Sequence, residues 1–137
     1  VQLAVRPSGL GLELIGDYAA PVDRQSLFGR IRQALDVKHL LVAGPEDGTV
    51  TRAAACAGSC GDLVDDAIRQ QAGLYLTGEM RHHDALRAAA AGITVVCVLH
   101  SNSERAVLRV LGERLRRACA GLHVIQSQRD RDPFSVL

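Results

Sequence analysis

The strongest constraint on the fold is the run I-T-V-V-C-V-L at residues 93–99, which contains no charged side chain and no alternation of polar and apolar positions. A strand with one face in solvent alternates polar and apolar residues, whereas a continuous apolar run is typical of a strand covered on both faces. Strands of that kind lie in the middle of parallel sheets, between two layers of helices. We therefore expect residues 93–99 to form the central strand of an α/β domain.

Helical and extended patterns alternate around this strand. From residue 51 onward the order is β-α-β-α-β-α-β, which predicts a mostly parallel sheet flanked by helices and joined by right-handed crossovers. Upstream, residues 11–18 and 39–43 are predicted to be extended, and a helix follows the N-cap Asp23 and runs to about Leu35. The strands expected after residue 50 are 51–57, 74–77, 93–99 and 123–127, and the helices are 62–71, 81–91 and 103–119.

The last of these helices is amphipathic. Leu108, Leu111, Leu115 and Cys119 recur at helical spacing, so we expect them to face inward and the leucines to be buried. The arginines of the same helix are interleaved with glutamates, which is typical of a solvated helix face.

Length and charge limit the classes of protein and partner. A chain of 137 residues has the usual size of one domain, and we expect residues 1–137 to form a single α/β domain. Its formal net charge of +1 gives no overall attraction to nucleic acid, so no direct nucleic-acid binding is expected. No apolar stretch approaches the ~20 residues that a membrane span requires, so no membrane association is expected.

The cysteines indicate the cellular compartment. Cys56, Cys60, Cys97 and Cys119 show no C-x-x-C spacing, and at least two of them lie in apolar runs, where cysteine behaves as a small hydrophobe. We therefore expect four reduced thiols and a cytoplasmic protein.

Polar segments follow three of the expected strands, at the edge of a parallel sheet where ligands gather. Residues 56–61, C-A-G-S-C-G, form either a tight turn or an anion cradle at a helix start. Residues 77–84, T-G-E-M-R-H-H-D, place four titratable side chains within two helical turns, as a functional pocket or as ordinary surface and capping residues: Glu79, His82, His83 and Asp84.

The third segment, H-S-N-S-E, carries a histidine and a carboxylate in reach of each other. Helical side chains lean toward their own N-terminus, so Glu104 can reach back toward His100. Imidazole nitrogen and carboxylate oxygen are a usual ligand pair for zinc, iron or manganese. The alternative is that Ser101 or Ser103 caps the helix and that His100 is a structural histidine.

Several of these motifs together resemble a known family. C-A-G-S at 56–59, L-Y-L-T-G-E-M-x-H-H-D at 74–84, A-x-x-G-I-T-V at 89–95, H-S-N-S-E-R at 100–105 and D-R-D-P at 130–133 stand in the order and spacing of that family. The chain, from about residue 9 to its end, resembles the Ngg-one-interacting-factor-three-like family, also described as the GTP cyclohydrolase type-two-like family. The eukaryotic branch is the most similar.

The resemblance implies an α/β fold that holds two divalent metal ions, zinc, iron or manganese, in a cleft between two halves, within ring-shaped homo-oligomers. By position, His100 and Glu104 are metal ligands, and Glu79, His82 and His83 belong to the pocket. The family's amino-terminal half, which supplies the other ligands, has no counterpart here, so the chain resembles a carboxyl-terminal half. Where many relatives carry Gly before the histidine, this chain has Leu99.

Two functions follow from the resemblance. The first is a metal-dependent hydrolase that acts on a nucleotide, as the name GTP cyclohydrolase suggests, with the isolated half inactive. The second is a non-enzymatic regulatory or interaction protein that binds a transcriptional co-factor and needs neither metal nor turnover.

Overall fold

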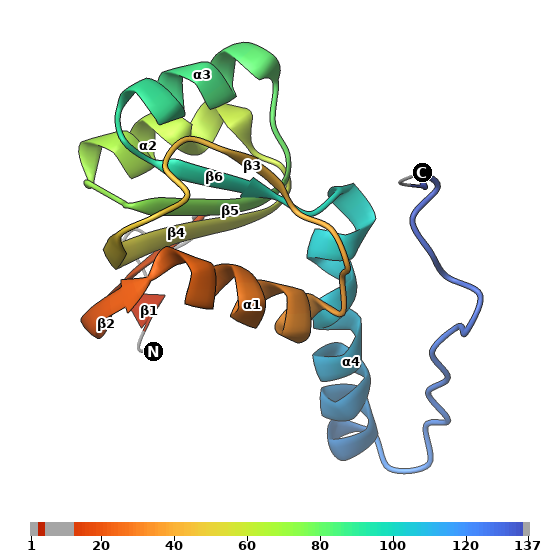
Figure 1. The fold of residues 1–137 in the computed structure, drawn as a ribbon. Coiled ribbons are helices and arrows are strands. Elements are labelled where there is room, and N and C mark those ends of the chain that lie inside the picture. The colour runs from red at the N-terminus through yellow and green to blue at the C-terminus, as the bar shows by residue number, and fades with distance from the viewer. Residues whose placement is uncertain (1–2, 5–12, 136–137) are drawn as a thin grey trace.

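The computed structural model describes residues 3–4 and 13–135, which form a six-stranded sheet with helices on both faces (Figure 1). The strand order is β1-β2-β4-β5-β6-β3. Three central strands are parallel, and the outer strands pair antiparallel with their neighbours. The strands are β1 (Leu3–Ala4), β2 (Leu14–Asp23), β3 (Leu41–Ala43), β4 (Thr49–Ser59), β5 (Leu74–Glu79) and β6 (Thr94–Cys97).

The α/β architecture predicted from the sequence is confirmed, and parallel pairing is confined to β4, β5 and β6. The strand expected at residues 93–99 is β6, which covers only residues 94–97 and lies second from the edge of the sheet, between β5 and the short edge strand β3, and not at its centre. Its apolar run is explained by burial, because Val95 and Val96 point to opposite faces of the sheet and are 1% and 0% exposed.

Helices cover both faces of this sheet. On one side lies α1 (Arg24–Leu35), and on the other lie α2 (Val64–Arg69), preceded by the 3-10 turn η1 (Gly61–Leu63), and α3 (His82–Ala90) (Figure 1). The predicted start of α1 is confirmed, because the Asp23 carboxylate accepts a hydrogen bond from the Ser26 amide. The helix ends at Asp36, which adopts a left-handed conformation.

Adjacent residues of the central strands belong to two separate hydrophobic cores, one on each face of the sheet. Tyr75 and Val95 pack with Val64 of α2 on one face of the sheet. Leu74 and Val96 belong to the opposite core, with α1. Because successive side chains of a strand point to opposite faces, the two cores fix the register of every central strand.

A buried arginine ties together the amino ends of these strands. The Arg24 guanidinium donates hydrogen bonds to Thr94 Oγ1 at 2.8 Å, to the Asp47 carbonyl at 2.9 Å and to the Thr49 carbonyl at 3.2 Å. A buried guanidinium is tolerated only when its donors are satisfied, and here it links α1, β4 and β6. The opposite, carboxyl edge of the sheet is thereby left for the polar segments.

The last helix, α4 (His100–Ala118), departs from prediction in two ways. It begins at His100, three residues earlier than expected, and its apolar stripe is not buried. Leu108 and Leu111 are 47% and 48% exposed, Cys119 is exposed, and Gly112 is the one buried residue of this helix. The physical reason is visible in Figure 1, where α4 extends beyond the sheet, so no layer covers its later turns.

The strand predicted at residues 123–127 is absent, since these residues have no regular secondary structure. The edge of the sheet beyond β6 is occupied by β3, which leaves no partner there for another strand. The segment instead lies along α4, where the Val124 carbonyl accepts a hydrogen bond from Arg116. Within the described residues, no helix is long and apolar enough to cross a membrane.

Two matched leucine truncations test this arrangement. Leu74→Ala should lower the free energy of unfolding by about 2–5 kcal/mol, because Leu74 is 3% exposed and its removal leaves a cavity. Leu108→Ala should cost less than about 1 kcal/mol, because that side chain is half exposed. Denaturant midpoints of the two variants measure the difference. Equal costs would mean that α4 is buried in solution.

Candidate metal centre

His100 and Glu104 lie on neighbouring turns of α4, where the helix leaves the carboxyl edge of the sheet. The His100 Nε2 atom is 3.5 Å from Glu104 Oε1. Both side chains are about half exposed, at 48% and 54%, so a small ion has access to the gap between them. A ring nitrogen and a carboxylate oxygen at this separation can both contact one cation.

Glu79, the last residue of β5, contacts the other nitrogen of the same ring. Its Oε2 atom is 3.3 Å from His100 Nδ1. If Nδ1 carries the proton and donates to this carboxylate, the Nε2 lone pair is free on the side of Glu104. A carboxylate behind a ligand histidine also fixes the orientation of the ring. Glu79 is therefore positioned to orient His100, the role that metal sites commonly give to such a carboxylate.

The C-A-G-S segment forms a wall of this site. A side chain at Gly58 would place its Cβ 3.1 Å from Glu104 Oε1 and 3.4 Å from His100 Nε2, and the residue has a φ of +78°. Residues 56–59 are the end of β4, where the pairing with β5 shifts register, and they do not form the tight turn that was one of the two sequence interpretations. Gly58 permits close approach of this strand end to the two candidate ligands.

Ser103, which the sequence indicated only as a candidate helix cap, connects the segment around Gly58 to α4. Its hydroxyl accepts a hydrogen bond from the Gly58 amide at 2.8 Å and donates to the His100 carbonyl at 2.6 Å. Thr77 donates to the Gly58 carbonyl at 3.2 Å. At Gly78 a Cβ would lie 2.7 Å from the Ser103 hydroxyl oxygen, so only glycine fits there. The ends of β4 and β5 therefore meet α4 in close contact.

The expectation of four reduced cysteines is wrong, because Cys56 and Cys60 form a disulfide. The pairing of β4 with β5 shifts register between Cys56 and Ser59, and this bend brings the two Cα atoms to 6.1 Å. No spacing rule predicts such a bend. Cys97 and Cys119 are free, and burial raises the pKa of the Cys97 thiol to about 11. The cytoplasmic assignment loses the support that four reduced thiols would have given it.

The two histidines of the T-G-E-M-R-H-H-D motif lie at the start of α3. The rings of His82 and His83 contact each other edge to face at 5.5 Å, and both residues are exposed. Neither forms a described hydrogen bond with His100, so their place in the pocket stays a prediction. Asp84 of the same motif is buried and pairs with Arg81 and Arg87, at 2.8 and 3.1 Å. Part of this polar cluster is therefore structural.

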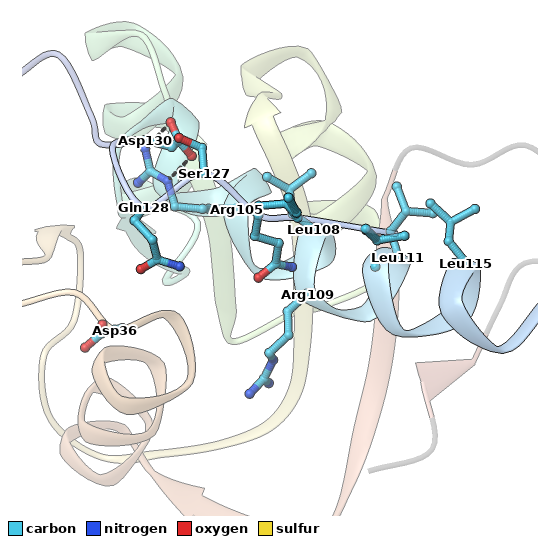
Figure 2. A pocket seen from close by; sticks show the side chains of 13 residues that line it. Asp36, Arg105, Leu108, Arg109, Leu111, Leu115, Ser127, Gln128 and Asp130 are labelled. Carbon is cyan, nitrogen blue, oxygen red and sulfur yellow. Dashed lines mark hydrogen bonds and ion pairs between the residues drawn. The ribbon is translucent and has the colours of Figure 1, made fainter. Parts of the chain in front are cut away.

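The D-R-D-P motif near the carboxyl end docks on the first turns of α4. Arg105 pairs with Asp130 at 2.7 Å (Figure 2). The Ser101 hydroxyl donates to Asp132 at 2.5 Å. The motif and H-S-N-S-E-R, about 25 residues apart, are thus two sides of one contact. Their joint appearance in the sequence was the available signal for this contact.

Two candidate ligands do not make a complete metal site. Tight sites supply three or more protein ligands, and the described part of the chain holds no group of three or more His, Cys, Asp or Glu side chains arranged for one ion. His100 and Glu104 fit a divalent ion as two members of a larger ligand set.

Comparisons with known proteins agree with this architecture. A family model described as Duf34/NIF3 (NGG1p interacting factor 3) matches residues 3–133. NIF3-like protein 1 of Rattus norvegicus is 39% identical over 126 residues, which cover 85% of this chain and 31% of the relative. NGG1-interacting factor 3 of Saccharomyces cerevisiae is 38% identical over 140 residues, which cover 94% of this chain and 48% of the relative.

A solved structure has the same fold. The crystal structure of a Bacillus cereus protein related to NIF3 superposes with a TM-score of 0.76 at 28% identity, over 93% of this chain and 36% of that one. The fold is thus that of an α/β protein whose polar segments converge at the carboxyl edge of its central strands. The chain belongs to the Duf34/NIF3 family. The matched part spans 31% to 48% of the length of these relatives.

Acid should release the D-R-D-P segment. The Arg105 hydrogen bond lowers the pKa of Asp130, and the hydrogen bond from Ser101 lowers that of Asp132, both from an ordinary value of 3.8. A lowered pKa in the folded chain means that docking is fully favoured above the ordinary value and is lost as pH falls through the folded values. The heteronuclear NOE of the Phe134 amide, which donates to Asp132, should therefore fall below about pH 4 while that of Val96 does not. An unchanged Phe134 signal at pH 3 would contradict the prediction.

The residue before His100 is strained. Leu99 has φ 71° and ψ 153°, a region of backbone space that is essentially restricted to glycine. We expect Leu99→Gly to be more stable than Leu99→Ala by about 1–2 kcal/mol, because only the alanine variant keeps a Cβ in that conformation. At the exposed helical position Leu86 the order should be reversed, with Leu86→Ala more stable by about 1 kcal/mol. Thermal unfolding of the four variants gives both differences. If the alanine variant is the more stable one at both positions, strain at Leu99 is excluded.

Proposed function

We propose that this chain supplies His100 and Glu104 as two ligands of a dinuclear divalent-metal site in a metal-dependent hydrolase that acts on a nucleotide such as GTP. The observation that carries the proposal is the convergence of His100 Nε2 and Glu104 Oε1 while Glu79 contacts the opposite ring nitrogen. Zinc, iron and manganese all accept such ligands. The remaining ligands come from outside these 137 residues, since the relatives are two to three times longer.

The residues at the carboxyl edge have different roles in the proposed site: binding the ion, orienting the imidazole and keeping access open. A bound divalent ion would lower the pKa of a water molecule and polarise the substrate. His100 and Glu104 hold the ion, and Glu79 orients the imidazole through Nδ1. Gly58 keeps the approach to both ligands free of side-chain atoms, and Ser103 holds the end of β4 that contains it.

A second candidate function is a regulatory or interaction protein, and the uncovered face of α4 favours it. Leu108, Leu111 and Leu115 are between 36% and 48% exposed, and with residues 124–128 they line a hollow of about 660 Å³ (Figure 2). Apolar side chains gathered in this way are typical of protein contacts. The name of the yeast relative, NGG1-interacting factor 3, describes an interaction. A second copy of the chain, as in a homo-oligomer, is another partner for this face.

Manganese titration of the chain by calorimetry tests the first function. The isolated chain should bind weakly, with a dissociation constant of about 1 μM or higher, and should not hydrolyse GTP, because two ligands leave most of the coordination to water. His100→Ala and Glu104→Ala should each abolish measurable binding. Glu79→Gln should weaken it by about tenfold, the effect of removing a carboxylate behind a ligand histidine.

The matched control is His39→Ala, which removes an exposed histidine of the same chain and should leave manganese binding unchanged. Unchanged binding in His100→Ala would refute the ligand assignment. Two tightly held ions in the isolated chain would mean either that a partner copy supplies ligands or that Glu79, His82 and His83 are ligands themselves. A chain that holds no manganese and still self-associates would favour the interaction function.

A further inference from the structure

The Cys56–Cys60 disulfide encloses the part of the chain that lies nearest to the candidate ligands. Cys56 belongs to β4, and Cys60 follows the end of that strand by one residue. Between them lies Gly58, whose Cα faces His100 Nε2 and Glu104 Oε1 so closely that a Cβ would be 3.4 and 3.1 Å from these atoms. Residues 57–59, the 57–59 loop, are the irregular end of β4, where its pairing with β5 shifts register. A covalent constraint on this loop is therefore a constraint on one wall of the site.

Movement of Gly58 would be transmitted to α4. Its amide donates to the Ser103 hydroxyl, and that hydroxyl in turn donates to the His100 carbonyl. A shift of the loop would therefore break this hydrogen bond and the one that Thr77 donates to the Gly58 carbonyl, and Ser103 beside the histidine would lose one of its two partners. The far end of the loop is held independently, because the Tyr75 hydroxyl donates to the Cys60 carbonyl at 2.9 Å. Any loosening is thus confined to residues 57–59.

The two sulfur atoms differ in access. Cys56 is 4% exposed and packs in the core with Val64 and Tyr75, whereas Cys60 is partly exposed at the rim of that core. Thiols in solution therefore reach the Cys60 sulfur first. A bridge that is accessible from one side, and whose sulfurs are only four positions apart, can open without unfolding the sheet.

We propose that this disulfide is a redox switch that controls the order of the loop 57–59 and, through it, the His100–Glu104 site. The reductant is a small thiol of the glutathione class. Its thiolate attacks the Cys60 sulfur, the S–S bond breaks, and Cys56 leaves as a thiolate that takes a proton from water. A second thiol molecule cleaves the mixed disulfide, so Cys60 becomes a thiol and the two donor molecules become one disulfide. Two electrons pass to the protein.

The consequence for the site rests on the proposed metal function. In the bridged form the loop is held against His100 and Glu104, and the ligands are preorganised. In the reduced form the loop gains freedom, so binding of an ion must also order it and the affinity falls. Oxidation therefore favours, and reduction disfavours, occupation of the site.

Amide hydrogen exchange of the whole chain tests the switch directly. In oxidised protein the Gly58 amide is expected to exchange at least about tenfold more slowly than in protein reduced with a phosphine, whereas amides of α3 keep their rates. Cys60→Ser should exchange like reduced protein under both conditions. Cys119→Ser, which removes an exposed free thiol, should keep the response. Equal Gly58 rates in the oxidised and reduced forms would overturn the proposal.

Two further measurements separate the switch from the metal function. Thiol titration of denatured, unreduced protein should give two thiols, and a count of four would overturn the switch. Manganese affinity, chosen because thiolates compete poorly for that ion, should fall about tenfold on reduction. Equal and measurable affinities in the two forms would also overturn the switch. No manganese binding in either form would refute the metal function, and Gly58 exchange would then decide the switch alone.

Discussion

Burial of both faces of the central strands is the constraint on which the rest of the structure depends. Tyr75 and Val95 need cover on one side, which the crossover helices α2 and α3 supply, and Leu74 and Val96 need cover on the other, which α1 supplies (Figure 1). Parallel strands follow from these crossovers, and their carboxyl ends are then brought to one edge. The meeting of three motifs far apart in the sequence at that edge is a result of core packing.

The sequence predicted those parts of the fold that depend on local pattern and burial. The N-cap at Asp23, the extent of α1, the order of elements from β4 to α4 and the approach of Glu104 to His100 all follow from spacing alone. For Glu79 the sequence predicted only a place in the same pocket as His100, and not a contact with its ring. Its role behind Nδ1 depends on which strand ends next to which helix, and pattern does not specify that distance.

The wrong predictions share a physical cause, which is that a local pattern does not identify its partner. The stripe of Leu108 and Leu111 is amphipathic whether or not another layer is present, and in this chain α4 extends past the sheet. Residues 123–127 could pair with β6 only if that strand had a free edge, and β3 occupies the position. The Cys56–Cys60 disulfide depends on a register shift in β4, which no cysteine count reveals.

The hydrogen bonds of Arg24 lie at the edge of the sheet opposite the candidate ligands. The residues that hold the strands together therefore differ from the residues that could perform chemistry. The two groups are separated by the length of the strands. For an engineer this means two nearly independent design problems. Thermal tolerance can be selected at the amino edge, and ion preference or reactivity can be selected at the carboxyl edge, with little trade-off between them.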